Sequence, residues 1–72
     1  MENVTPPTTR LLRREEVEHV TGLSRSTIYD AMAAGRFPRP VPLTATARAW
    51  PEDEILAWIA GRIAARDSAE AA

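Results

Sequence analysis

The sequence contains no cysteine, no lysine, a single histidine and three glycines among its 72 residues. Without cysteine, disulfide bonds and thiolate metal sites are excluded, and nothing requires an oxidising compartment. The sequence also lacks an apolar run long enough to cross a membrane and a charged-then-apolar leader of the kind that directs secretion. We therefore expect one small cytoplasmic domain with a marginal core, because short chains bury a small fraction of their surface.

The residues from which active sites are built are also scarce. The single histidine, His19, lies among Glu15, Glu16 and Glu18, with no second histidine or cysteine at metal-ligand spacing. We expect it to be an ordinary surface histidine. The sequence has no nucleophile elbow, no phosphate-binding glycine loop and no carboxylate pair away from the helix ends. These absences predict a protein that is not an enzyme and that uses no metal, cofactor or small-molecule ligand.

The charge is distributed unevenly along the chain, although the formal net charge is −1. Residues 10–50 carry seven arginines against four carboxylates, a net charge of +3, whereas residues 51–72 carry two arginines against five carboxylates, a net charge of −3. All nine basic residues are arginine, whose planar guanidinium group suits phosphates and guanine edges. An arginine-only, alanine-rich composition is equally typical of a GC-rich genome, so composition alone leaves the partner open.

Two short helices are predicted in the first half of the chain. In LLRREEVEHVTG, Val17 and Val20 recur at helical spacing, and Gly22 follows as a stop in the left-handed conformation. Ser24 is a strong N-cap candidate for a second helix over residues 25–34, which Gly35 ends. Two short helices joined by such a turn form a helix-turn-helix. The residues on the apolar face of the second helix are Ile28, Ala31 and Met32.

A proline-rich segment follows, in which prolines at every second position from Pro38 to Pro42 exclude a helix. The residues on either side of TATA predict the two arms of a small hairpin, with Pro42 on an edge strand. The spacing of the large apolar residues assigns Phe37, Trp50 and Trp58 to the core. The hairpin arms carry Val41 and Leu43, then Arg48 and Trp50.

A third helix is predicted over residues 51–66. Pro51 suits the first helical position, and three acidic residues follow it, where they complement the helix dipole. The segments 1–9 and 67–72 show no apolar period, so we expect a disordered N-terminal arm and a disordered C-terminal tail around a domain over residues 10–66. The apolar stripe of the third helix is Ile55, Trp58, Ile59 and Ile63, and Leu56 beside it is a candidate protein contact.

Four features stand out in this order: TGLSRSTIY, GRFPRPV, a tryptophan that closes the hairpin and AWI in the last helix. Together they resemble the AlpA family of phage and prophage transcriptional regulators, and the resemblance covers about residues 10–66. The family is related to excisionases and has a MerR-like winged helix-turn-helix. The resemblance therefore implies a mainly α fold, with three helices and a short β-hairpin wing, that binds double-stranded DNA sequence-specifically.

The resemblance further implies that the helix at residues 24–34 enters the major groove and that the hairpin at residues 38–50 is a wing on the adjacent backbone or minor groove. From the residues themselves, Arg25 suits a guanine edge or a phosphate, and Ser24 is first of all a helix cap. Ser26 and Thr27 suit DNA contact and local backbone bonding equally. The expected DNA-binding residues are Ser24, Arg25, Ser26, Thr27, Tyr29, Arg36, Arg39 and Arg48.

Two positions depart from the family pattern. Many relatives have a basic residue where this chain has Asp30, which we expect to weaken non-specific binding or to pair with Arg25 or an arginine beyond Gly35. An arginine usual near Thr46 is displaced to Arg48, which keeps it on the same strand face if the hairpin is regular. Both departures concern which bases are read.

Three functions stay open from the sequence. The first is a transcriptional regulator that works with RNA polymerase, the second an excisionase that bends an attachment site for a recombinase, and the third a protein-interaction module that binds no DNA. The acidic last helix favours the third. One recognition helix reads few base pairs, so we also expect a cooperative homo-oligomer on DNA.

Overall fold

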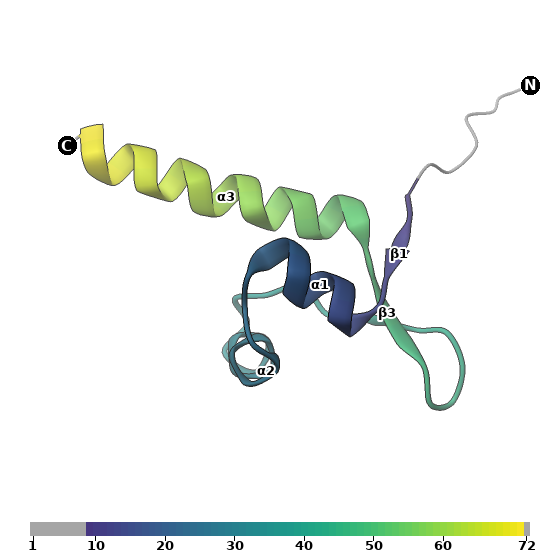
Figure 1. Cartoon of the computed structure of the whole chain (residues 1–72). Coiled ribbons are helices and arrows are strands. Elements are labelled where there is room, and N and C mark those ends of the chain that lie inside the picture. The colour runs from purple at the N-terminus through teal and green to yellow at the C-terminus, as the bar shows by residue number, and fades with distance from the viewer. Residues whose placement is uncertain (1–8, 72) are drawn as a thin grey trace, which may run out of the picture.

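The computed structural model describes residues 9–71 of the chain (Figure 1). Three helices and a small three-stranded antiparallel sheet make up this part, so the predicted fold, mainly α with a helix-turn-helix and a β-hairpin wing, is confirmed. α1 lies against α3, while α2 and the tip of the hairpin lie on the side away from α3 (Figure 1). In chain order the elements are β1 (Leu11–Leu12), α1 (Arg14–Thr21), α2 (Arg25–Ala33), β2 (Val41–Pro42), β3 (Arg48–Pro51) and α3 (Glu52–Ala71).

The turn between α1 and α2 is specified by its own residues. The Thr21 hydroxyl donates to the Val17 carbonyl oxygen at 2.7 Å and accepts from the Leu23 N–H at 3.2 Å. Gly22 has a φ of 76°, in the left-handed region that favours glycine, so the predicted stop is confirmed. Leu23 packs against the core, and this contact fixes the angle at which the chain enters α2.

The hairpin predicted around TATA is present, with shorter strands than predicted. Leu43 belongs to the loop instead of a strand, and its N–H donates to the Ala47 carbonyl oxygen at 2.7 Å. The Thr44 hydroxyl accepts from the N–H groups of Thr46 (3.3 Å) and Ala47 (3.0 Å), so a threonine closes a turn that lacks an Asn-Gly pair. Pro42 lies on an edge strand as predicted, since the strand order is β1-β3-β2.

A third strand, β1, at Leu11 and Leu12 was not predicted from the sequence. Leu12 lies opposite Trp50 in the antiparallel register with β3, and Leu11 lies opposite Pro51. The Glu52 N–H donates to the carbonyl oxygen of Arg10, the residue before β1, at 2.7 Å. A strand of two residues is too short for alternation to reveal it, and tertiary pairing determines its conformation.

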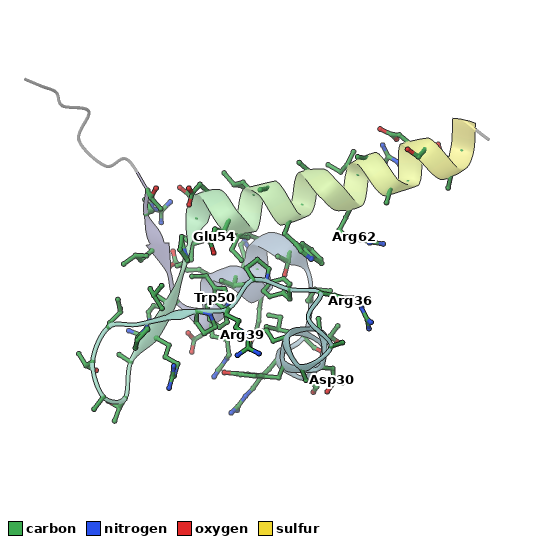
Figure 2. The ribbon with its side chains drawn as sticks, turned by 180° about the vertical axis from the view of Figure 1, so that it is seen from behind. Asp30, Arg36, Arg39, Trp50, Glu54 and Arg62 are labelled. Carbon is green, nitrogen blue, oxygen red and sulfur yellow. The ribbon has the colours of Figure 1, made fainter. Side chains whose placement is uncertain are left out.

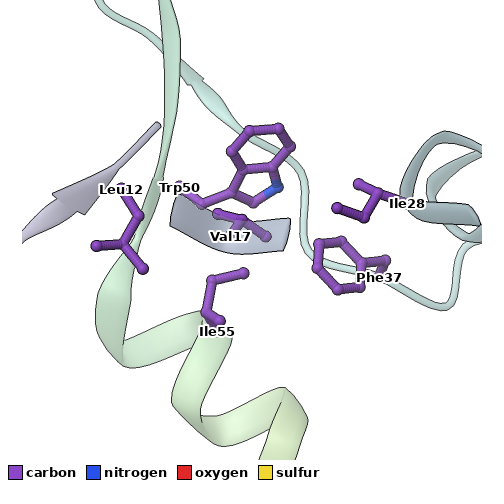
Figure 3. Packing of buried hydrophobic residues seen from close by; sticks show 6 residues of the cluster. All are labelled: Leu12, Val17, Ile28, Phe37, Trp50 and Ile55. Carbon is purple, nitrogen blue, oxygen red and sulfur yellow. The ribbon is translucent and has the colours of Figure 1, made fainter. Parts of the chain in front are cut away.

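The core lies where the sheet meets the three helices (Figure 3). The predicted core positions of Phe37 and Trp50 are confirmed, and Trp58 is partly buried against the same cluster. Val20 was expected beside Val17 on the apolar face of α1. Val17 is the buried residue of that helix, whereas Val20 is 46% exposed. The buried cluster comprises Leu12, Val17, Ile28, Phe37, Trp50 and Ile55.

α3 is longer than predicted and packs along its first half. Pro51 ends β3 instead of starting the helix, and Ile55 is buried, whereas Ile63 is 47% exposed. Every residue from 60 to 70 is exposed. Residues 67–71, expected to be a tail, continue the helix, because their alanines and glutamate favour helix and no proline or glycine interrupts them.

The predicted N-terminal arm, residues 1–9, lies outside the described part of the chain except for Thr9. Within residues 9–71, none of the three helices combines the length and the apolar character that a membrane span requires.

Candidate nucleic-acid interface

The first turn of α2 is held by the predicted serine cap. The Ser24 hydroxyl oxygen accepts from the Thr27 N–H at 3.2 Å and lies 2.9 Å from the Thr27 hydroxyl oxygen. These two side chains therefore partner each other and fix the start of the helix. Ser26 is exposed, and no described residue hydrogen-bonds its side chain.

Arg25 and Tyr29 form a pair on the exposed surface of α2. The Arg25 Cζ atom lies 5.8 Å from the centroid of the Tyr29 ring, and the two residues are one helical turn apart. Tyr29 is 44% exposed, so it is partly packed and partly open to solvent. The contact lays the Arg25 side chain along the helix and restricts its direction.

Two tryptophans anchor the segment between α2 and the wing. Trp58 Nε1 donates to the Arg36 carbonyl oxygen at 2.8 Å, and Trp50 Nε1 donates to the Pro38 carbonyl oxygen at 2.9 Å. Phe37 lies between these bonds and meets the Trp58 ring edge-on, with centroids 4.9 Å apart. The backbone of residues 36–38 is therefore bound to the core, which fixes where the adjacent arginines leave the surface.

The arginines of this segment lie on different sides of α2. Arg39 lies between α2 and the wing, whereas Arg36 projects on the other side of α2 (Figure 2). Arg48 is the first residue of β3 and lies opposite Pro42 of β2 in the antiparallel register. All three side chains belong to exposed residues.

Two shallow hollows lie between α2 and the wing, and both are lined by Tyr29 and Arg48. One has a volume of about 330 Å³ and the other about 270 Å³. The two hollows therefore lie between α2 and the wing, the two elements that were predicted from the sequence to contact DNA. The first is also lined by Met32, Ala33, Arg39 and Pro40, and the second by Arg13, Arg14, Glu15, Thr46 and Trp50.

Sequence reasoning missed Arg13 as a member of this surface. Helical periodicity relates residues on one helix, and it carries no signal about which neighbouring segment lies beside Tyr29. Thr46 and Arg48 were expected to share a strand face if the hairpin is regular. This condition fails, because Thr46 lies in the loop and β3 begins at Arg48. Both nevertheless line the same hollow.

The arginines divide into two groups by their acidic partners. Arg14 donates to Glu18 at 2.9 Å, and this hydrogen bond raises the pKa of Arg14 above its ordinary value. Arg62 on α3 has no carboxylate of residues 9–71 within 4.0 Å. The ion-paired arginines are Arg10, Arg14 and Arg66. Those of the α2 and wing surface that also lack such a carboxylate are Arg13, Arg25, Arg36, Arg39 and Arg48.

Asp30 forms no ion pair with a described arginine, so the expected pairing with Arg25 or with an arginine beyond Gly35 is wrong. Arg25 lies on the Tyr29 ring instead. Asp30 is exposed on α2, where it adds a negative charge to this surface (Figure 2). Within residues 9–71, no three acidic, histidine or cysteine side chains are grouped to hold a metal ion, and His19 is exposed on α1.

The three helices, the turn between α1 and α2 and the hairpin define a small winged helix-turn-helix. Residues 10–63 match the family described as prophage CP4-57 regulatory protein (AlpA), and the chain belongs to this family of prophage regulatory proteins. It is 53% identical over 57 residues to the uncharacterized protein ORF88 of Enterobacteria phage P4. That match covers 79% of this chain and 65% of the relative, so the chain spans just under two thirds of the length of that protein.

Proposed function

We propose that this protein binds double-stranded DNA sequence-specifically and regulates transcription from a promoter of a prophage or mobile element. Membership of a prophage regulatory family supports the regulatory role. One observation carries the DNA-binding role: the arginines of α2 and the wing have no carboxylate of residues 9–71 within 4.0 Å, although the net charge of the chain is −1. DNA phosphates are the partner that such a surface suits.

In the proposed complex, α2 enters the major groove with its first turn towards the bases. Arg25 reads a guanine edge, because its guanidinium group offers two parallel donors and its direction is restricted by Tyr29. Ser24 and Thr27 hold the start of the helix, and Ser26 is free to donate to a phosphate or a base. The Tyr29 hydroxyl contacts the backbone.

The wing arginines neutralise phosphates on the adjacent backbone or enter the minor groove. Arg39 and Arg48 line one hollow with Tyr29, so they approach the same stretch of backbone as α2. Arg36 lies on the other side of α2 and reaches a separate phosphate (Figure 2). Regulation then follows from occupancy, because bound protein blocks or recruits RNA polymerase without any chemical step.

Fluorescence anisotropy with sheared DNA of the source genome, at several salt concentrations, tests this proposal. We expect affinity that falls steeply with salt, with a few fragments retained at high salt that contain the preferred site. Weak binding that does not depend on salt concentration would contradict the proposal. It would favour the protein-interaction module, whose partner would then be sought by pull-down.

An excisionase would use the same face, so binding alone does not separate it from a regulator. A circular-permutation gel assay on the selected fragment measures DNA bending. We expect little bending for a regulator. A strong bend, with dependence of excision on the protein beside a recombinase, would favour the excisionase.

We further propose that the exposed face of α3 that carries Leu56 and Ile63 contacts a second copy bound at a neighbouring site. Leu56 and Ile63 are 52% and 47% exposed and share one face of the helix, since they are two turns apart. An antiparallel pairing that puts Leu56 opposite Ile63 also puts Asp53 opposite Arg66 and Glu52 opposite Asp67, so opposite charges and like charges both meet at the two ends. The apolar contact is small, so we expect pairing on DNA and not in free solution.

Sedimentation analysis on duplexes with one site and with two adjacent sites tests this contact. Wild-type protein should fill two sites cooperatively, and Ile63→Glu should lose the cooperativity while its affinity for one site stays unchanged. Independent filling of two sites by the wild type would contradict the contact. Ala64→Glu, a change at another exposed position of the same helix, is the matched control.

A further inference from the structure

Arg13 lies at the junction of three segments that meet beside α2. It follows β1 directly and precedes α1, and the hollow of about 270 Å³ that it lines is shared with Tyr29 of α2, Thr46 of the hairpin loop and Arg48 of β3. Neither helical periodicity nor the family motifs singled it out. Its position nevertheless brings an arginine to the place where the recognition helix and the wing come together.

The backbone of Arg13 is held independently of its side chain. Its N–H donates to the Glu16 carboxylate at 3.2 Å, and its carbonyl oxygen accepts from the Val17 N–H at 3.0 Å. The preceding residue, Leu12, is buried and paired with Trp50. A change confined to the Arg13 side chain should therefore leave the start of α1 intact.

The charges around the hollow favour an anion. Arg14 and Glu15 also line it, and they bind each other at 3.5 Å while Arg14 binds Glu18. Arg13 and Arg48 have no carboxylate of residues 9–71 within 4.0 Å, so the hollow is lined by three arginines against the one carboxylate of Glu15. The Tyr29 side chain adds a hydroxyl donor.

We propose that this hollow is a seat for one phosphodiester group of the DNA backbone, held by Arg13 and Arg48 with the Tyr29 hydroxyl. This inference rests on the proposed DNA binding and adds a residue and a ligand position to it. A phosphate held between α2 and the wing fixes the depth and register of α2 in the groove, because backbone contacts position a protein while base contacts specify the sequence. Arg13 thus contributes affinity that is independent of sequence.

The first test compares Arg13→Gln with Arg62→Gln by anisotropy over a salt series, on the preferred duplex and on an unrelated one. Both arginines are exposed and lack a carboxylate of residues 9–71 within 4.0 Å, but Arg62 lies on α3 (Figure 2). Arg13→Gln should weaken binding to both duplexes by about fivefold and reduce the slope of log K against log salt by about one. Arg62→Gln should change neither. Circular dichroism checks that both variants are folded.

The second test locates the phosphate. Single methylphosphonate linkages, which remove one backbone charge each, are placed in turn along the preferred duplex. At one or two linkages, neutralising the phosphate should lower the affinity of the wild type. On those duplexes Arg13→Gln should cause no further loss of affinity, because the phosphate that Arg13 contacts is already neutral. If the cost of Arg13→Gln is the same at every linkage, Arg13 holds no particular phosphate and the seat is disproved.

The outcomes separate this inference from the proposed function. Salt-independent, weak binding by the wild type overturns both. Loss of affinity in Arg25→Ala and Arg48→Gln, with an unchanged salt slope in Arg13→Gln, overturns the phosphate seat and leaves DNA binding in place.

Discussion

The α2 and wing surface and the outer half of α3 both carry arginines, but they differ in packing and in charge balance. On the first surface the backbone of residues 36–38 is bound to the core by the indoles of Trp50 and Trp58. In the outer half of α3, residues 62–71, all residues with a described burial (62–70) are exposed, and Arg66 is paired with Asp67 at 2.7 Å. The first surface thus has a segment anchored to the core and arginines available to an external anion, whereas the second balances part of its charge internally.

This contrast explains how a chain of net charge −1 can suit a polyanion. Local charge, and not the total, acts on a ligand, because charges are screened beyond about 10 Å at an ionic strength of about 0.1 M. The carboxylates that accompany the arginines of residues 10–50 are directed mainly to Arg10 and Arg14, which leaves the remaining arginines available.

The largest effect is expected from Trp50→Ala, which breaks the anchoring of that segment itself. The variant loses a buried ring and the bond to the Pro38 carbonyl oxygen, so the free energy of unfolding should fall by about 3–5 kcal/mol. Chemical denaturation measures this loss. Ile63→Ala on the outer half of α3 is the control and should change the free energy of unfolding by less than about 0.5 kcal/mol, since its side chain is exposed. Equal losses would refute the contrast.

The next effect concerns charge on a correctly folded surface. Removing both Arg25 and Arg48, each to Ala, should lower affinity for the preferred duplex by about a hundredfold, because one base contact and one phosphate contact are lost. The matched double variant replaces Arg62 and Arg66 on α3 and should retain wild-type affinity for a single site. Anisotropy titrations measure both. If the α3 variant loses as much, the protein presents the other surface to DNA.

A smaller effect is expected at the start of α2. Ser24→Ala removes the acceptor of the Thr27 N–H and should lower the free energy of unfolding by about 1 kcal/mol. Ser26→Ala, in the same turn, removes an exposed side chain without a described hydrogen bond and should be close to neutral. Thermal denaturation compares the two. A neutral Ser24→Ala would show that the cap does not hold the helix.

The smallest effect should follow from ending the chain after Arg66. The removed residues continue α3, but those with described side chains, 67–70, are exposed. We expect the free energy of unfolding to change by less than about 0.5 kcal/mol and single-site affinity to stay the same. Denaturation and anisotropy check these values, and a large loss in either would show that the end of α3 contributes to the packed domain.

Local signals in the sequence predicted most of the fold. Gly22, Ser24 and Gly35 marked the helix ends, because their conformations and hydrogen bonds depend on neighbours in the chain. Ile28 and Ile55 were assigned to the core by helical spacing. The strand at Leu11 and Leu12 was missed because its partner lies far along the chain.

The candidate site was predicted in part, for the same reason. The residues on α2 follow from one helix, and their exposure agrees with the expected surface. The position of Arg13 beside Tyr29 depends on β1, α2 and the hairpin meeting, and so does the anchoring of Arg36 by Trp58. Such contacts arise from tertiary packing, which no periodic pattern encodes. The roles of these residues towards DNA stay predictions.

The most direct test of the central claim is an NMR titration of the labelled protein with the preferred duplex, which reports which backbone amides change their environment. We expect shifts concentrated at residues 24–29, 36–39 and 46–48 and at Arg13, with little change over residues 60–70 when one site is present. Shifts concentrated along residues 60–70, or none at a concentration of duplex that saturates binding, would contradict the claim that α2 and the wing form the DNA-binding surface.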